Sequence, residues 1–326
     1  MSDLHIPVLS KEVIESFSIF KEKSELVYFD GTYGRGGHFR LVQNEYHPQT
    51  SYLTDQDQVA IQAAQAEWGT ALEQKRISIF HQNFSNFAQS LKDSSLLKMN
   101  MILLDLGVSS PQLDQSERGF SFNKDGPLDM RMNQSLKTTA ADLINQLEPE
   151  ELTEIFKSYG EIFHSARVVR AITQDRVNKP FLTTLQLAQL IERVDGWQKK
   201  GFHPATQYFM ALRLVVNREL EVVETALPLL IDHLQDGGRM SVITFHSLED
   251  RLVKNIFKDS TQGFLVNKKV IVPTEEECKI NPRARSAKLR IFQKGAEPVK
   301  PDKFALRRAL RDSGHEDDET KDDNNK

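Results

Sequence analysis

Short apolar runs alternate with longer, more polar stretches along the first 105 residues of the chain. Each run has the length of a buried strand, and the stretches between runs are long enough to form helices. Strands that alternate with helices form a mostly parallel sheet with helices on both faces. The pattern therefore predicts a doubly wound α/β domain, with strands at Leu26–Phe29, Ser51–Thr54, Arg76–Phe80 and Met101–Leu104.

From residue 110 to residue 205 this alternation is replaced by loops and amphipathic helices. In residues 151–159 the apolar positions fall on one helical face. Thr183 or Thr184 is suited to cap a second helix over Leu185–Val194.

Strand-like runs return after this helical stretch, at Arg239–Phe245 and Lys288–Gln293. The economical interpretation is one α/β domain, residues 1–109 and 206–300, interrupted by a helical domain of residues 110–205. Two sequential domains are the alternative.

A glycine-rich loop, Asp30–His38, follows the first predicted strand and precedes a helix expected from about Phe39. A strand, a glycine-rich turn and a helix N-terminus together form a nucleotide-type pocket. Phe39 stands where a dinucleotide motif has its third glycine. The leading carboxylate of Asp30 suits a positively charged ligand such as S-adenosylmethionine (SAM), although a glycine turn without a ligand is the alternative.

Three further side chains follow predicted strands and fit a SAM pocket. Asp55 ends the second strand, where a carboxylate accepts hydrogen bonds from ribose hydroxyls. Phe84 follows the third strand and is suited to pack on an adenine ring. Asp105 ends the fourth strand, at the edge where such sheets bind ligands. Each residue alone also fits a helix cap or a core position, so the inference depends on their joint spacing.

The segment Leu104–Gln112 contains a Ser110-Pro111 pair directly after the fourth strand. It resembles the loop with which methylases hold an exocyclic amine, where a side-chain oxygen and a backbone carbonyl accept the N–H groups. Gln112 replaces the aromatic residue usual in that loop. Stacking on the target base is therefore expected from elsewhere, with Phe120 and Phe122 as candidates.

Two later segments carry charged residues. In Phe245–Arg251, His246, Glu249 and Asp250 have a spacing compatible with a metal site, but an ordinary helix start capped by Ser247 explains them better, and we predict no metal. Basic residues between 281 and 290 have few acidic neighbours, which suits phosphate contacts. The predicted RNA contacts are Arg283, Arg285 and Lys288.

The overall composition is that of a globular protein of 326 residues with a net charge of −4. Residues 312–326 contain seven acidic residues and two lysines, so we expect a disordered acidic tail there. The single cysteine, Cys278, excludes an intramolecular disulfide and suits a reducing compartment. Without a signal peptide pattern or a run of transmembrane length, we expect a cytoplasmic protein with no membrane partner.

Taken in order, several segments resemble the bacterial 16S rRNA (cytosine-N4)-methyltransferase family. They are HIPVL (5–9), DGTYGRGGH (30–38), LDLGVSSPQLD (104–114), the RGFSF and GPLDMRM stretch (118–132), FHSLEDR (245–251) and NPRARSAKLR (281–290). The resemblance implies a Rossmann-like class I SAM-dependent methyltransferase domain with an inserted helical domain for substrate recognition. It also implies methylation of a decoding-centre cytidine in the 16S rRNA of the small ribosomal subunit.

Carried over to this chain, the resemblance implies two groups of site residues. The SAM contacts are expected at Gly36, Gly37, His38, Asp55, Phe84, Asp105 and Gln112, and the catalytic group at Ser110, Pro111 and Asp105. One departure is Asp55-Gln-Asp57-Gln58, where the family tends to have Asp-Arg-Asp-Pro; the carboxylate is retained. The oligomeric state stays open, with a dimer as one possibility.

Two other classes of function are compatible with parts of the sequence. A nicotinamide-dependent oxidoreductase would also use a glycine loop, although Asp30 and Phe39 argue against it. A non-catalytic RNA-binding or assembly protein on a methylase fold is the second alternative, and the intact Ser110-Pro111 loop argues against it.

Overall fold

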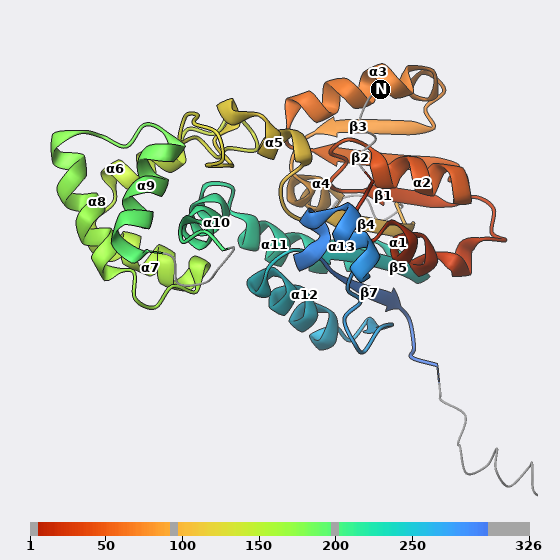
Figure 1. The fold of residues 1–326 in the computed structure, drawn as a ribbon. Coiled ribbons are helices and arrows are strands. Elements are labelled where there is room, and N and C mark those ends of the chain that lie inside the picture. The colour runs from red at the N-terminus through yellow and green to blue at the C-terminus, as the bar shows by residue number, and fades with distance from the viewer. Residues whose placement is uncertain (1–5, 92–96, 197–201, 299–326) are drawn as a thin grey trace, which may run out of the picture. The chain divides into compact units, whose positions relative to one another are not determined.

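The computed structural model describes residues 6–91, 97–196 and 202–298. Within these residues seven strands form one sheet in the order β3-β2-β1-β4-β5-β7-β6 (Figure 1). The first five of these positions are parallel, and β7 pairs antiparallel with both β5 and β6. This arrangement confirms the predicted Rossmann-like α/β fold. The strands are β1 (Val27–Asp30), β2 (Thr50–Asp55), β3 (Ile77–His81), β4 (Met99–Asp105), β5 (Leu234–Thr244), β6 (Gly263–Leu265) and β7 (Lys288–Lys294).

Helices cover both faces of the sheet, because neighbouring residues of a buried strand point to opposite sides. In β4, Met101 and Leu103 join the core beneath α1, α2 and α3, whereas Ile102 and Leu104 join the core beneath α4, α11 and α12. The near-continuous apolar run that predicted this strand therefore serves two cores at once. The bounds are α1 (Ser10–Ser16), α2 (Gly37–Tyr46), α3 (Gln58–Glu73), α4 (Phe84–Ser90), α11 (Glu219–Asp232) and α12 (Ser247–Asp259).

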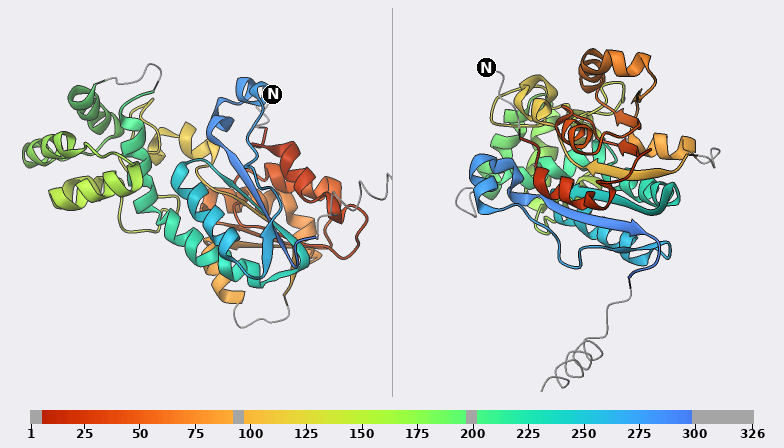
Figure 2. Two further views of the ribbon diagram at one scale, coloured as in Figure 1. Left: turned by 90° about the horizontal axis from the view of Figure 1, so that it is seen from below. Right: turned by 90° about the vertical axis from the view of Figure 1, so that its right-hand side faces the viewer.

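The helical segment after β4 has a hydrophobic core of its own, which extends from Phe120 to Val216. Figure 1 shows α6, α7, α8 and α9 grouped together, with α10 between them and the sheet, and Figure 2 gives two further views of this segment. The two predicted helices are present as α7 and α9, and Thr183 is the N-cap of α9 in a capping box with Gln186. The helices are α5 (Ser110–Asp114), α6 (Ala140–Gln146), α7 (Pro149–Gly160), α8 (Ala166–Asn178), α9 (Thr184–Asp195) and α10 (Ala205–Val216).

The remaining elements are short. They are α13 (Glu275–Ile280) and the 3-10 helices η1 (Ser18–Phe20), η3 (Ser116–Arg118) and η4 (Pro282–Ser286). The predicted acidic tail, residues 312–326, lies outside the described residues. In the part of the chain that the structure describes, no helix has the length and apolar character needed to cross a bilayer.

The strand order determines where a ligand site forms. Strand β1 lies between β2 and β4, and the chain leaves β1 toward β2 but later returns to its other side as β4. Loops that leave β1 and β4 therefore diverge, and a crevice opens at the carboxyl ends of these strands. Both predicted motifs, the glycine loop and the Ser110-Pro111 loop, follow these two strands.

Candidate active site

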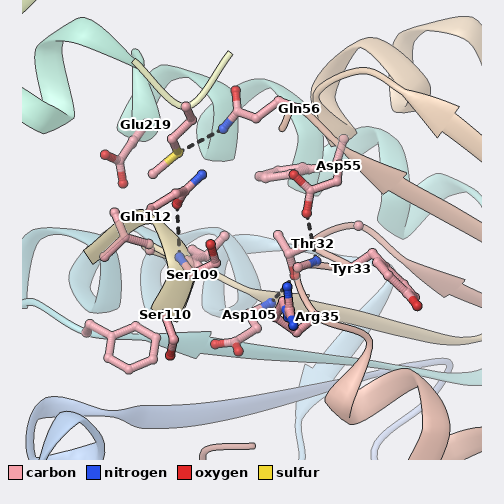
Figure 3. A pocket seen from close by; sticks show the side chains of 18 of the residues that line it. Thr32, Tyr33, Arg35, Asp55, Gln56, Asp105, Ser109, Ser110, Gln112 and Glu219 are labelled. Atoms are coloured by element: carbon pink, nitrogen blue, oxygen red, sulfur yellow. Dashed lines mark hydrogen bonds between the residues drawn. The ribbon is translucent and has the colours of Figure 1, made fainter. Parts of the chain in front are cut away.

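A cavity of about 650 Å³ lies at the carboxyl edge of the sheet, within the usual size range of small-molecule sites (Figure 3). Its walls come from the glycine loop, the ends of β2 and β4, the start of α4, the loop after β5 and the junction of α10 with α11. Segments that are far apart in the sequence therefore meet at one site.

The glycine loop contributes backbone to the cavity, and internal contacts fix its shape. Gly34 and Gly37 line the cavity, whereas Gly36 does not. Gly36 has a φ of 70°, and a Cβ atom there would lie 2.4 Å from the hydroxyl of Tyr33, so a larger residue would disrupt the turn. The helix begins at Gly37, two residues before the predicted start at Phe39. Gly36 therefore shapes the loop rather than contacting a ligand.

Asp30 is buried and has a structural role in this loop. Its carboxylate accepts the N–H of Thr32 at 3.1 Å and the hydroxyl of Tyr28 at 3.4 Å. Burial raises the pKa of Asp30 to about 7. Asp30 is not among the cavity-lining residues, so the expectation that it faces a cationic ligand is not supported by its position.

Asp55 lines the cavity at the end of β2 and holds the turn around it. One carboxylate oxygen accepts the N–H of Gly34 at 2.7 Å, and the other accepts the N–H of Asp57 at 2.8 Å. Burial raises the pKa of Asp55 to about 6. Each carboxylate oxygen retains a further lone pair, so Asp55 is able to accept ribose hydroxyls as predicted.

Asp105 and His38 meet at the centre of the site. His38 Nε2 lies 2.8 Å from the carbonyl oxygen of Val8, and because a carbonyl only accepts, Nε2 carries the proton. Nδ1 then faces Asp105 Oδ2 at 3.6 Å. Burial lowers the pKa of His38 and raises that of Asp105 to about 7. Among the described residues, Asp105 Oδ1 is buried and has no hydrogen-bond partner, so its capacity to accept a hydrogen bond is unused.

The loop after β4 folds into the short helix α5, with Ser109 as its N-cap. The N–H of Ser109 donates to Gln112 Oε1 at 2.9 Å, and Gln112 Nε2 donates to Asp57 at 2.9 Å. Gln112 lines the cavity, but both ends of its amide are used within the protein. Each end of the amide keeps one free position, the second N–H of Nε2 and the second lone pair of Oε1, so the expected SAM contact of Gln112 stays a prediction.

Ser110 and Pro111 have different positions in this helix. Ser110 lines the cavity, as Figure 3 shows, but Pro111 does not. The Pro111 carbonyl accepts the N–H of Gln115 at 2.9 Å, because Ser110-Pro111 starts a helical turn. The interpretation of Pro111 as an acceptor for the amine is therefore not supported in this conformation.

Three aromatic residues line the cavity, and one of them, Tyr33, belongs to the glycine loop. Phe84 is present at the start of α4, as predicted for an adenine contact, and Phe245 lies in the loop after β5. Phe120 is buried in the core of the helical segment, and Phe122 packs against Phe209. Phe120 and Phe122 do not line the cavity, whereas Phe245 does, so the position of Phe245 suits stacking better than that of the two predicted candidates.

Charged residues from α10, α11 and α12 complete the wall, and the sequence did not single out the first two. Arg213 donates to both carboxylate oxygens of Glu219, at 2.8 and 3.0 Å. Glu249 accepts the N–H of Phe245 at 3.0 Å. The N-cap of α12 is His246 rather than Ser247, because the imidazole accepts the N–H of Glu249 at 3.4 Å. The helix-start interpretation of this motif is correct, although its cap is one residue earlier.

The three predicted RNA contacts differ in whether an acidic side chain of the protein already pairs with them. Arg283 lines the cavity and pairs with Asp114, and Lys288 lies 3.6 Å from Asp250. Within the described ranges, Arg285 is exposed and has no ion pair. Arg285 is therefore the most available cation of the three.

This geometry fits a cationic nucleoside ligand. The turn at Gly34 and Gly37 brings backbone to the cavity, and Asp55 provides acceptors at one end. Asp105 lines the same cavity and, among the described residues, has a buried carboxylate oxygen without a hydrogen-bond partner. The residues present therefore have the chemistry needed to hold SAM.

Comparisons with known proteins agree with this chemistry. The sequence matches the profile of the MraW methylase family over residues 2–295. Three similar proteins are each named ribosomal RNA small subunit methyltransferase H. The one from Bdellovibrio bacteriovorus is 56% identical over 294 residues, covering 90% of this chain and 88% of that protein. The one from a Cyanothece species is 45% identical over 293 residues (89% and 95%), and the one from Idiomarina loihiensis is 42% identical over 314 residues (90% and 98%).

Proposed function

Because this chain belongs to the MraW methylase family, we propose that it methylates the N4 amine of a cytidine in the decoding region of small-subunit ribosomal RNA. The protein is a SAM-dependent ribosomal RNA methyltransferase, and SAM is its methyl donor. The choice of N4 goes further, and it is supported by the residues at the end of β4. The decoding region and the small ribosomal subunit as partner are proposed from the resemblance of the sequence segments alone.

One observation carries the proposal. Ser110 and Asp105 line the same cavity as Asp55 and the glycine loop, so amine acceptors and donor-binding groups open into one space (Figure 3). The lone pair of an aromatic amine is delocalised into the ring. Oxygen acceptors on its N–H groups hold the nitrogen in place and favour its pyramidal form. No strong base is needed, because the proton becomes acidic only as the new bond forms.

SAM supplies a methyl group bound to positively charged sulfur. With SAM held by the glycine loop and Asp55, the N4 lone pair would form the new N–C bond as the C–S bond breaks, and the electron pair of that bond would stay with sulfur. N4 then releases one proton, which Asp105 is placed to accept. Ser110 orients the amine, and Phe245 stacks on the base. Such positioning alone contributes about 7–11 kcal/mol in comparable reactions.

The target base must leave its stack to reach this cavity, as for other enzymes that modify bases. We propose that the helical segment, residues 110–205, recognises the RNA around that base. Its helices pack around a core of their own, and Leu113 and Met132 of this segment line the cavity that would receive the extruded nucleotide.

The test is mass spectrometry of small-subunit RNA from cells that lack this protein. One cytidine in the decoding region should lose the mass of one methyl group, and the purified protein with SAM should restore it. Chromatography against N4-methylcytidine and C5-methylcytidine standards then identifies the atom. A C5-methyl product would contradict the choice of N4, and unchanged RNA would contradict the substrate.

A further inference from the structure

A buried arginine faces the cavity where the proposed function requires a base, and it has no role in the chemistry described above. Arg213 is near the end of α10, and its side chain is 15% exposed. It is held by the carboxylate of Glu219, the first residue of α11, which is 9% exposed. Both residues line the cavity, and Figure 3 shows Glu219 on the side opposite Ser110 and Asp105.

The guanidinium of Arg213 is oriented and still has donors to spare. Nε and Nη2 donate to the two oxygens of Glu219, at 2.8 and 3.0 Å. Such a bidentate pair fixes the plane of the guanidinium. In the portion of the chain with described coordinates, Nη1 makes no hydrogen bond, so two N–H groups remain for a ligand.

Glu249 connects this pair to the reactive end of the site. Its carboxylate is anchored by the N–H of Phe245 at 3.0 Å and lies 3.0 Å from His246 Nε2. The charge of Glu249 acts on both Asp105 and Arg213. Asp105, Phe245 and Arg213 all line the same cavity, so a planar ring with its amine at Asp105 has Arg213 on the wall of the space that it occupies.

Cytosine presents an edge of matching polarity. The N4 amine donates, whereas N3 and O2 accept, and O2 is at the far end of the edge from N4. We propose that Arg213 donates from Nη1 to O2 of the target cytosine while Glu219 holds the guanidinium in place. This proposal rests on the N4-cytidine function above and adds the residue that selects the ring.

The pairing explains how one exocyclic amine is chosen over another. Adenine carries an amine at the equivalent position, but it has C2–H where cytosine has its O2 oxygen. Adenine would leave the N–H groups of Arg213 buried without an acceptor, which is the situation that gives strong discrimination. Uracil keeps O2 but brings an oxygen to Asp105 in place of the amine. Glu219 balances the charge of Arg213. The cation therefore draws little electron density from the ring, and the N4 lone pair remains able to attack the methyl group.

The test replaces O2 of the target cytidine by sulfur, a weaker acceptor, in a small-subunit RNA substrate, and measures single-turnover methylation. With the parent protein the sulfur substrate should react about 10-fold more slowly. The paired variant Arg213→Gln with Glu219→Gln avoids leaving a lone buried charge. It should be about 10- to 100-fold slower on normal RNA, since hydrogen bonds to charged groups contribute about 1.5–3 kcal/mol, and it should no longer distinguish sulfur from oxygen.

A matched control removes a similar buried pair elsewhere. Arg290 donates to both oxygens of Asp250, at 2.6 and 3.1 Å, and neither residue lines the cavity. The variant Arg290→Gln with Asp250→Asn should keep the parent's full sulfur effect. An equal sulfur effect in the Arg213 variant and the parent would overturn the proposal. A parent protein that methylates no N4 atom would contradict the proposed function itself, and this inference with it.

Discussion

At the scale of single residues, Asp55 illustrates how one side chain serves both the loop and the ligand. Its two carboxylate oxygens hold the N–H groups of Gly34 and Asp57. Asp55→Ala should weaken SAM binding by about 1.5–3 kcal/mol, because a charge-assisted hydrogen bond to the ribose is lost. Calorimetry on the purified protein measures this change. Unchanged SAM affinity would remove Asp55 from the cofactor site, and the thermal midpoint reports separately on the loosened turn.

Ser110 and Pro111 are neighbours in the sequence, and the structure separates their roles. Ser110 lines the cavity, whereas the Pro111 carbonyl is used inside α5. Ser110→Ala should slow single-turnover methylation by about two to three powers of ten, as loss of one positioned partner does in comparable sites. Pro111→Ala should have a much smaller effect. Near-normal rates for Ser110→Ala at saturating SAM and RNA would leave Asp105 or a water molecule as the amine's acceptor.

The raised pKa of Asp105 predicts a pH dependence of the rate. Its ordinary value is 3.8, and burial together with the charge of Glu249 raises the pKa to about 7. Below pH 7 the protonated carboxyl is a poor acceptor for the amine, so the methylation rate should rise as the pH increases through about 7. Asp105→Asn should react more slowly and without this rise. A parent rate that is flat across this range would exclude Asp105 from the chemical step.

The raised pKa of Asp105 also affects stability. Whereas the rate should rise with pH, the stability of the folded protein should fall. A carboxyl whose pKa is higher in the folded protein binds its proton more tightly there than in the unfolded chain. This stabilisation is complete below about pH 3.8 and is lost as the pH rises through about 7. The thermal midpoint of Asp105→Asn minus that of the parent should therefore increase as the pH is raised from 4 to 8.

At the scale of elements, Arg118 ties three segments together. It donates to Asp57 at 2.7 Å and to the carbonyl oxygens of Arg131 and Met132 at 3.1 and 2.9 Å, and its side chain is 5% exposed. Asp57 also caps α3 and accepts from Gln112. Arg118→Met should lower the free energy of unfolding by about 3–5 kcal/mol, because it leaves a buried carboxylate unpaired. Denaturant unfolding measures this.

An exposed ion pair provides the control for Arg118. Arg193 and Asp175 lie 2.8 Å apart with side chains 65% and 49% exposed. Arg193→Met should change the free energy of unfolding by less than about 1 kcal/mol. Equal losses in the two variants would mean that the contacts of Arg118 do not hold these segments together.

Local patterns in the sequence were sufficient to predict an element where its own residues determine its structure. The apolar run Met101–Leu104 predicted β4, which the structure extends to Met99–Asp105. The cap of α9 was narrowed to Thr183 or Thr184, and the capping box with Gln186 selects Thr183. The role of Pro111 could not be predicted in this way, because the same two residues form either a turn or the first turn of a helix.

At the scale of the whole molecule, the unpredicted part of the site comes from long-range contacts. Asp55 and Asp105 end strands of one parallel sheet, so their meeting follows from the predicted topology. Arg213 and Glu219 lie on two helices about a hundred residues further along the chain, in a pattern that also suits a solvated surface. Only the packing of α10 and α11 against the sheet edge reveals that they line the cavity.

The basic segment at the cavity mouth gives a prediction for RNA binding. Arg283 and Lys288 each have an acidic partner in the folded protein, whereas Arg285 is exposed. Phosphate contacts release counterions, so each lost contact with single-stranded RNA should reduce the slope of log affinity against log salt by about 0.7. The triple alanine variant should bind small-subunit RNA more weakly and reduce this slope by up to about 2. SAM affinity should change little, since only Arg283 of the three lines the cavity and it pairs with Asp114.

Single variants separate the three cations. Arg285→Ala should reduce the salt slope by a full contact, because Arg285 has no ion pair among the described residues. Arg283→Ala and Lys288→Ala should each have a smaller effect, since Asp114 or Asp250 already offsets part of the charge that RNA would use. Asp114→Asn should then increase RNA affinity by freeing Arg283. A salt slope for the triple variant equal to that of the parent would mean that this segment faces solvent in the complex and that the RNA follows another surface.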